Sequence, residues 1–246
     1  MNASRCTPTS GIESIAKLKL GGPAGYGSYA VEKRIRKLDQ SLSLRGMKVL
    51  DLGCGNGCYT RELALRAKVV IGLDVQMSNL RDFRQAIPRA QGVGEELPFA
   101  SESFDAVTMI EVLEHTDSDV RVMHECFRVL RPGGRVIIFA PNKLYPLESH
   151  PCHLGGVSIG PNIPLVSWLP DRLHSRFCYA KIYTRRKLLA VAKEAGFEPQ
   201  EIGYIFPPLD SFPIPCKHAY RRMAWRLEKT YLRVFGVSLF AILRRA

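Results

Sequence analysis

Short apolar runs alternate with segments of helical spacing over residues 47–140. Each run is short enough to be one buried strand, and the segments between them repeat apolar residues at helical intervals. The predicted strands are residues 48–53, 69–74, 90–93, 104–110 and 134–140, and the predicted helices are 58–66, 77–86 and 118–129. This alternation is typical of a parallel sheet with helices on both faces. The pattern therefore predicts an α/β, doubly wound fold.

The pattern changes on either side of that core. A helix is predicted from about residue 28 to 44, with Val31, Ile35, Leu38 and Leu42 on one face. Regular spacing is interrupted at about 141–183 and 207–235, and loops of such length are commonly functional. The later elements are predicted at 185–195 and 217–234 (helices) and at 201–206 and 237–243 (strands). We therefore divide the chain into an N-terminal helical segment, 1–46, and a domain, 47–246, with these two insertions.

The net charge of +12 over 246 residues is the unusual bulk property. A positive surface attracts nucleic acid, anionic lipid or an acidic substrate, and composition does not choose among them. Much of the charge lies on the predicted helix 217–234, which also carries an apolar stripe. The stripe consists of Tyr220, Met223, Ala224, Leu227, Tyr231 and Val234. A basic amphipathic helix can lie on an anionic membrane, although packing of the stripe against the sheet is the favoured interpretation.

Membrane spans and disulfides are not expected. No apolar run is long enough to cross a bilayer, and residues 1–10 lack the apolar core of a signal peptide. Seven cysteines, an odd number without framework spacing, indicate reduced thiols in a reducing compartment. These features predict a cytoplasmic protein or one that is peripheral at the inner membrane face.

A glycine-rich turn follows the first predicted strand, in the run Asp51-Leu-Gly-Cys-Gly-Asn-Gly57. Glycines at this place let the backbone approach a nucleotide-like ligand, and Asp74 ends the next strand where a carboxylate can accept ribose hydroxyls. A dinucleotide site would have its third glycine where Cys58 stands. Asp51 inside the strand favours instead a ligand with a cationic end, such as an amino acid.

The run from Asp51 to Gly57 resembles motif I of the class I S-adenosylmethionine-dependent methyltransferases, closest to the small-molecule branch called type 11, which includes quinone-biosynthesis enzymes. Three further segments resemble that family: Glu95–Phe99 its adenine-binding turn, Phe104–His115 its fourth motif, and Leu130–Gly134 the turn before its fifth strand. The resemblance implies a Rossmann-like, seven-stranded, mostly parallel sheet whose last strand is antiparallel and inserts beside the fifth. It also implies that the N-terminal segment is a lid over the cofactor.

The resemblance assigns S-adenosylmethionine as cofactor and places it against particular residues. It implies that Asp51 and Gly53 face its methionine end, that Gly55 and Gly57 pass close to it, and that Asp74 and Val75 hold the ribose. Ile110 and Glu111 line the sulfonium, while Glu95 or Glu96 serves the adenine. Val93 departs from the family pattern, which has an acid at that place to accept the adenine amine.

Candidate catalytic residues come from the first insertion and the N-terminal segment. His150 is the preferred base for deprotonating an acceptor, with His153 and Tyr29 as alternatives. Glu114-His115 is interpreted either as a brace for its turn or as part of the site. His150-Pro-Cys-His153 has the donors of half a metal site, but no second cluster in the sequence completes it, so no metal is predicted.

The resulting hypothesis is methyl transfer to an O, N or C atom of a small or amphiphilic acceptor, such as a lipid-linked, polyprenyl or glycolipid-like molecule. The aromatic, proline-rich insertions around Trp225 support an apolar acceptor. Two alternatives stay open at this point. One is a methyltransferase that binds RNA through its basic helices, and the other is a non-catalytic partner subunit that only binds the cofactor.

Overall fold

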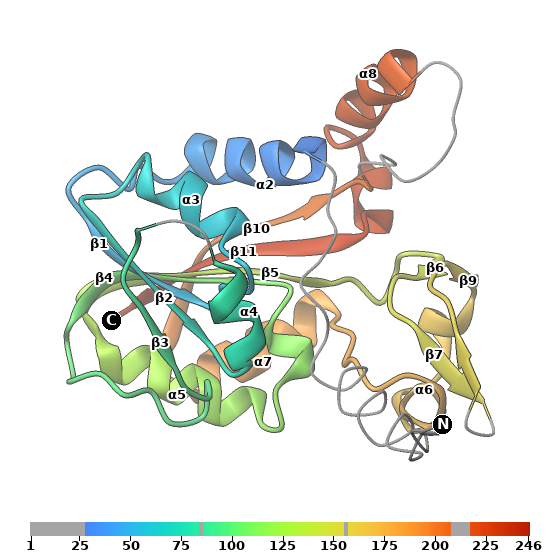
Figure 1. Ribbon diagram of the computed structural model, residues 1–246. Helices are drawn as coiled ribbons and strands as arrows, with labels where there is room; N and C mark the ends of the chain where they lie inside the picture. Colours follow the sequence, from blue (N-terminus) through green and yellow to red (C-terminus); the bar gives the residue numbers. More distant parts are fainter. Residues whose placement is uncertain (1–27, 84–85, 155–156, 208–216) are drawn as a thin grey trace, which may run out of the picture.

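A computed structural model describes residues 28–83, 86–154, 157–207 and 217–246 (Figure 1). The first part of the predicted lid, residues 1–27, and residues 208–216 of the second insertion lie outside the described residues. The division of the chain at residue 46 stays a prediction. None of the described helices is both long and apolar enough to cross a membrane.

The described residues form one seven-stranded sheet with the order β10-β11-β5-β4-β1-β2-β3. Its strands are β1 Lys48–Leu52, β2 Val69–Asp74, β3 Arg89–Gln91, β4 Phe104–Ile110, β5 Leu130–Pro141, β10 Phe197–Ile205 and β11 Ser238–Arg245. β11 is antiparallel to both β5 and β10, while β5, β4, β1, β2 and β3 pair in parallel. The predicted Rossmann-like sheet, with its last strand inserted beside the fifth, is confirmed.

Helices cover both faces of the sheet because successive strand residues point to opposite sides. In β1, Val49 packs with the cluster that includes α2 (Ser28–Ser41) and α3 (Cys58–Ala64), and Leu50 packs with α5 (Asp119–Val129) and α7 (Arg185–Glu194). Figure 1 shows these two helical layers on opposite sides of the strands. The short α4 (Met77–Asp82) lies near the end of β2. The predicted apolar face of α2 is confirmed, since Val31, Ile35 and Leu38 are buried in the first cluster.

The first insertion forms a small lobe beyond the end of β5 (Figure 1). It contains two short antiparallel pairs, a helix and a 3₁₀ turn. Their bounds are β6 Leu147–Glu148 with β9 Ile163–Pro164, β7 Cys152–Leu154 with β8 Val157–Ile159, η2 Val166–Trp168 and α6 Asp171–Phe177. A disulfide joins Cys152 to Cys178 across this lobe, with 4.5 Å between their Cα atoms. The expectation of reduced cysteines throughout is therefore wrong for this pair, which folding brings together from 26 residues apart.

Several predicted boundaries were also wrong, and two of them have an identifiable local cause. β10 begins at Phe197 rather than 201, because its first residues are exposed on an edge strand, where Pro199 is tolerated and apolar alternation is not required. The helix predicted over 217–234 ends as α8 at Leu227, and the 3₁₀ helix η3 (Tyr231–Phe235) follows. Thr230 interrupts it by accepting a hydrogen bond from the Leu232 amide. As a result the predicted stripe does not pack as one face: Ala224 is buried, but Tyr231 is 96% exposed.

Candidate functional site

The turn after β1 is held closely against the neighbouring strand. The amides of Gly53 and Cys54 both donate to the Leu73 carbonyl of β2, at 2.7 and 3.0 Å. Gly53 has a φ of +73°, and a Cβ there would lie 2.3 Å from Val112 Cγ2. At Gly57, φ is +85° and a Cβ would lie 2.5 Å from the Phe83 ring. Both positions therefore require glycine for conformation as well as for space.

Asp74 fixes the turn from the end of β2. Its Oδ2 accepts a hydrogen bond from the Gly55 amide at 2.8 Å. Its Oδ1 accepts from the Gln76 amide at 2.8 Å and from Asn79 Nδ2 at 3.1 Å. A carboxylate has room for about four such donors, so this one can still receive a ligand hydroxyl.

Asp51 lies in strand β1, just before the glycine turn, and its side chain is buried. Its carboxylate accepts hydrogen bonds from the Thr60 hydroxyl at 2.6 Å and from the Thr108 hydroxyl at 2.8 Å. Desolvation raises the pKa of Asp51 to about 6, although the two threonine hydrogen bonds act in the opposite direction. The carboxylate therefore supports the turn from inside the sheet.

A cavity of about 320 Å³ opens at this edge of the sheet. Among the described residues, it is lined by seven of those predicted to bind a cofactor: Gly53, Gly55, Asp74, Val75, Glu95, Ile110 and Glu111. Three others, Asp51, Gly57 and Glu96, lie outside its lining. Val93 lines it where the family has an acid, and the Glu95 carboxylate accepts hydrogen bonds from the amides of Asp117 and Ser118, at 2.8 and 3.2 Å.

An ion pair closes one end of the cavity. Glu111 follows β4 directly, with a φ of +56°, and its Oε1 lies 2.8 Å from Arg34 Nη2 of α2. The Ser238 hydroxyl of β11 donates to the same oxygen at 2.6 Å. Burial alone would raise the pKa of Glu111, but the Arg34 guanidinium, the Ser238 hydroxyl and His150 together hold the pKa below its ordinary value.

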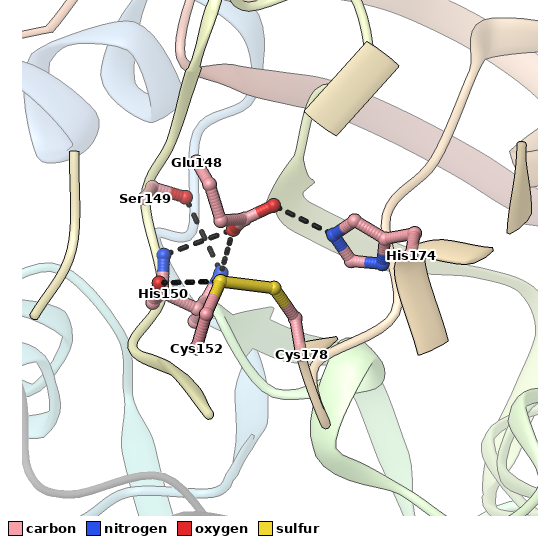
Figure 2. The surroundings of a disulfide bond; sticks show 6 residues. All are labelled: Glu148, Ser149, His150, Cys152, His174 and Cys178. Atoms are coloured by element: carbon pink, nitrogen blue, oxygen red, sulfur yellow. Dashed lines mark hydrogen bonds and ion pairs between the residues drawn. A yellow bond between two sulfur atoms is a disulfide. The ribbon is translucent and has the colours of Figure 1, made fainter. Parts of the chain in front are cut away.

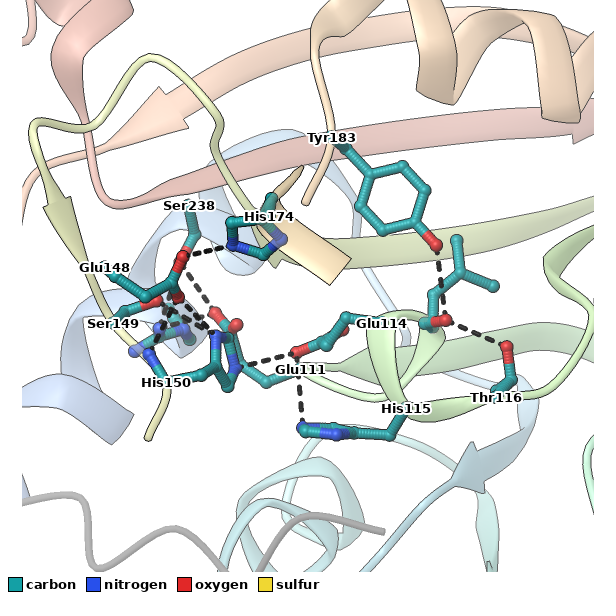
Figure 3. A network of polar contacts seen from close by, with 12 residues as sticks. Glu111, Glu114, His115, Thr116, Glu148, Ser149, His150, His174, Tyr183 and Ser238 are labelled. Atoms are coloured by element: carbon teal, nitrogen blue, oxygen red, sulfur yellow. Dashed lines mark hydrogen bonds and ion pairs between the residues drawn. The ribbon is translucent and has the colours of Figure 1, made fainter. Parts of the chain in front are cut away.

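A buried cluster of acids and histidines adjoins Glu111 (Figure 3). The Oε1 of Glu114, in η1 (Leu113–His115), lies 3.7 Å from His150 Nε2 and 4.0 Å from His115 Nε2. Desolvation raises the pKa of Glu114 to about 7. Burial alone would lower the pKa of His150, but the nearby carboxylates of Glu114 and Glu148 raise it to about 10.

Glu148 extends this cluster into the first insertion. Its Oε1 accepts from the His150 amide at 2.9 Å, and its Oε2 lies 2.7 Å from His174 Nε2. Burial alone would raise the pKa of Glu148, but hydrogen bonds from the two histidines lower it to about 2. Two groups among the described residues place metal-ligand atoms within 4.8 Å of one another: Glu114, His115 and His150, and Glu148, His174 and Cys178.

The candidate catalytic residues occupy three different places. His150 lies in the cluster beside the cavity, and its ring is 5.3 Å from that of His115, which lines the cavity. The His153 ring stacks on Tyr179 at 4.1 Å. The Tyr29 ring lies 3.7 Å from the Arg221 guanidinium and lines a second, more open cavity with Arg36, Arg222 and Trp225. The described structure therefore brings only His150 near the residues predicted to bind the cofactor.

A family model described as a methyltransferase domain matches residues 50–138, which include the glycine turn, Asp74 and Glu111. The ubiquinone biosynthesis O-methyltransferase of Pseudomonas fluorescens is 35% identical over 190 residues, covering 72% of this chain and 75% of that protein. The corresponding protein of Dechloromonas aromatica is 32% identical over the same coverage. The chain belongs to the S-adenosylmethionine-dependent methyltransferases.

Solved structures of similar fold agree with that assignment. An S-adenosylmethionine-dependent methyltransferase from Mesorhizobium loti superimposes with a TM-score of 0.60 at 21% identity, covering 85% of this chain and 96% of the other. A possible histamine N-methyltransferase from Thermotoga maritima gives 0.60 at 18% identity, with 89% and 90% covered. At these identities the comparison shows the fold of this methyltransferase and leaves its acceptor open.

The cavity fits the cofactor of this methyltransferase family. A Cβ on Gly53 would collide with Val112, so the backbone itself forms that part of the wall. The Asp74 carboxylate lies at the end of β2, where it can accept the ribose hydroxyls. S-adenosylmethionine supplies a methyl group on a positively charged sulfur when it is bound. Ile110 and Glu111, expected beside that sulfur, line the cavity.

Several supporting residues of this methyltransferase site were not found from sequence. Arg34 reaches Glu111 from 77 residues away, and Thr60 and Thr108 reach Asp51 from different elements. No local motif marks such contacts. For Arg34 the only sequence signal is its place in a helix whose other face is apolar, which gives no indication of its partner.

Proposed function

We propose that this methyltransferase methylates a hydroxyl group of a small amphiphilic acceptor, and that His115 receives the hydroxyl proton. The observation that carries the proposal is the position of His115. Its side chain lines the cavity beside Glu111, and the buried Glu114 carboxylate lies 4.0 Å from its Nε2. A histidine with a carboxylate behind it is the arrangement that enzymes use to accept a proton and stabilise the resulting cation.

His150 has a different part in this proposal from the one predicted from sequence. It lies on the far side of Glu114 and contacts both Glu114 and Glu148. From there it orients the Glu114 carboxylate toward His115. Methyl transfer also requires alignment of the acceptor oxygen with the cofactor, and the wall formed by Ile110 and Glu111 provides a surface for that alignment.

Oxygen methylation is supported by the names of the relatives, which are O-methyltransferases of ubiquinone biosynthesis. An amphiphilic acceptor is supported by apolar side chains that are exposed in the first insertion and on α8. In the insertion Val157 is 65% exposed and Trp168 is 48% exposed, and on α8 Trp225 is 57% exposed. Arginines accompany these side chains, including Arg221 and Arg222. On α8, the exposed Trp225 with Arg221 and Arg222 forms a surface suited to an anionic membrane from which the acceptor is taken.

The test of the proton acceptor compares His115→Gln with His124→Gln, an exposed histidine on α5. Turnover of a phenolic quinone precursor should fall by about 10²–10⁴-fold in His115→Gln, while the dissociation constant of the cofactor stays the same. The His124→Gln variant should match the wild type. Turnover of His115→Gln within twofold of the wild type would remove His115 from this role.

The membrane surface is tested separately by vesicle flotation. Vesicles with a fraction of phosphatidylglycerol should carry the protein upward, whereas phosphatidylcholine vesicles should not. A Trp225→Ser, Arg222→Ser variant should lose part of this binding and keep its affinity for the cofactor. Equal flotation with both kinds of vesicle would contradict an anionic membrane surface.

A further inference from the structure

The insertion lobe encloses a buried group of two cysteines, a histidine and a glutamate. The disulfide joins Cys152 to Cys178, the His174 Nε2 lies 2.7 Å from Glu148 Oε2, and all four residues are at most 3% exposed. The ligand atoms of Glu148, His174 and Cys178 lie within 4.8 Å of one another. Figure 2 shows the His174 ring directed at the Glu148 carboxylate, with the disulfide close by and Cys152 beside His150.

The packing of the lobe does not account for this group. Among the described residues between 144 and 182, none belongs to the apolar clusters of the sheet. The lobe consists of two short strand pairs and a seven-residue helix, which bury little apolar surface of their own. Small units of this kind are commonly stabilised by a disulfide or a bound metal ion. A buried histidine–glutamate pair is, by contrast, weak evidence for stability, because apolar residues of the same size often stabilise as well.

We propose that Cys152, Cys178, His174 and Glu148 bind a zinc ion when the disulfide is reduced. The lobe is then stabilised by the disulfide in the oxidised state and by zinc in the reduced state. Two thiolates, one imidazole and one carboxylate are a donor set that zinc prefers in tetrahedral sites. Ligand atoms of such a tetrahedron are roughly 3.3–3.8 Å apart, given zinc bonds of about 2.0–2.3 Å. The ligand atoms of Glu148, His174 and Cys178 already lie within 4.8 Å of one another. The Cys152 sulfur is bonded to that of Cys178, so reduction must let the two sulfurs separate before all four donors reach that geometry.

The structure also supplies the outer contacts that a zinc site uses. The second carboxylate oxygen of Glu148 accepts a hydrogen bond from the His150 amide at 2.9 Å, which would fix the carboxylate while the first oxygen binds the ion. His174 lies in α6, and Cys178 directly follows that helix with its amide bonded to the His174 carbonyl, so the end of α6 holds two of the ligands close together. Of the sequence HPCH at 150–153, only Cys152 is a ligand in this site, and the other donors come from Glu148, His174 and Cys178.

The disulfide form is converted to the zinc-bound form in two steps, reduction and metal binding. A dithiol reductant gives two electrons and two protons to the Cys152–Cys178 bond, which breaks into two thiols, and the reductant becomes a disulfide. Zinc then binds the two sulfurs as thiolates, and two protons are released to solvent. His174 now donates its Nε2 proton to Glu148; to bind zinc through the Nε2 lone pair it carries that proton on Nδ1 instead, a change of tautomer that releases no further proton. The contact with Glu148 is then replaced by two metal bonds.

The experiment measures metal content in both redox states of the full-length protein. Protein reduced with a dithiol should retain about one equivalent of zinc after gel filtration, and protein oxidised beforehand should retain at least tenfold less. Replacement of zinc by Co²⁺ should give the thiolate-to-cobalt charge-transfer band of a site with sulfur ligands. This band distinguishes the site from the Glu114, His115 and His150 group, which contains no thiol.

Variants identify the ligands. Cys152→Ser and His174→Ala should each lose the bound zinc under reducing conditions, whereas Cys58→Ser, a free cysteine of the glycine turn, should keep it. A reduced wild-type protein that binds no zinc, or a Cys152→Ser protein that binds as much as the wild type, would overturn the proposal. The wild-type comparison needs no variant, so the outcome does not depend on whether a substituted lobe folds.

Discussion

The Arg34 guanidinium lies 2.8 Å from the Glu111 carboxylate and joins helix α2 to the end of strand β4. Both side chains are at least 90% buried. Removing one partner of such a pair leaves an uncompensated buried charge, which costs about 3–5 kcal/mol. We therefore expect Arg34→Met to lower the free energy of unfolding by that amount in urea titrations, and to weaken cofactor binding because Glu111 lines the cavity.

Two further variants separate the pair from its surroundings. Arg34→Met combined with Glu111→Leu should recover much of the lost stability, because no charge is then left buried. It should not recover turnover. Arg36→Gln breaks an exposed pair with Glu32 on the same helix and should change stability by less than about 0.5 kcal/mol. A loss of stability in Arg36→Gln equal to that in Arg34→Met would contradict this account.

Local patterns in the sequence predicted the strands of the parallel part of the sheet, and the family resemblance predicted the antiparallel strand inserted beside the fifth. Strands β1, β2 and β4 are apolar runs buried on both faces, and the glycine turn and Asp74 mark the edge where the cavity opens. Edge strand β10 was predicted too short because its outer residues are solvated. In the candidate site, only residues that lie within the sequence motifs could be predicted. Arg34, Ser238 and His174 join the site through long-range packing, which periodicity and spacing do not encode.

Gly53 and Gly46 offer a matched test of why the turn needs glycine. Both have a positive φ, but a Cβ on Gly46 would meet nothing within 4 Å, whereas one on Gly53 would meet Val112 at 2.3 Å. Gly46→Ala should cost about 1–2 kcal/mol from backbone strain alone. Gly53→Ala should cost a further 1–3 kcal/mol or so from overpacking, and it should reduce cofactor affinity because the wall of the cavity moves.

The collision at Gly53 can be relieved independently of the strain. Val112→Ala in the Gly53→Ala background should restore part of the stability lost to overpacking, as measured by urea unfolding. The strain would remain, since φ at residue 53 is unchanged. If the double variant is no more stable than Gly53→Ala, then contact with Val112 is not the reason for glycine at this position.

Asp74 is expected to contribute the largest polar contact with the cofactor. Hydrogen bonds to a charged group contribute about 1.5–3 kcal/mol each. Asp74→Asn should therefore weaken binding of S-adenosylhomocysteine by roughly 10–100-fold in calorimetric titration. Asp82→Asn, an exposed carboxylate on α4, is the control and should bind like the wild type. Unchanged affinity in Asp74→Asn would mean that the ribose is held elsewhere.

Asp51 should give the protein a pH dependence of stability with a defined sign. The pKa of its carboxyl is raised from 3.8 to about 6 in the folded state by desolvation. Between these values the folded chain holds a proton that the unfolded chain has lost, so the free energy of unfolding falls as the pH rises through this range. The full effect is about 3 kcal/mol, at 1.36 kcal/mol per pKa unit.

The variant Asp51→Asn should remove this fall in stability. The stability of the variant relative to the wild type should therefore increase between about pH 4 and about pH 7, as measured by urea unfolding at both values. Asp39→Asn, whose carboxyl is largely exposed, should keep the wild-type dependence. If the wild type and Asp51→Asn show parallel pH profiles, then burial between Thr60 and Thr108 does not raise the pKa of the Asp51 carboxyl.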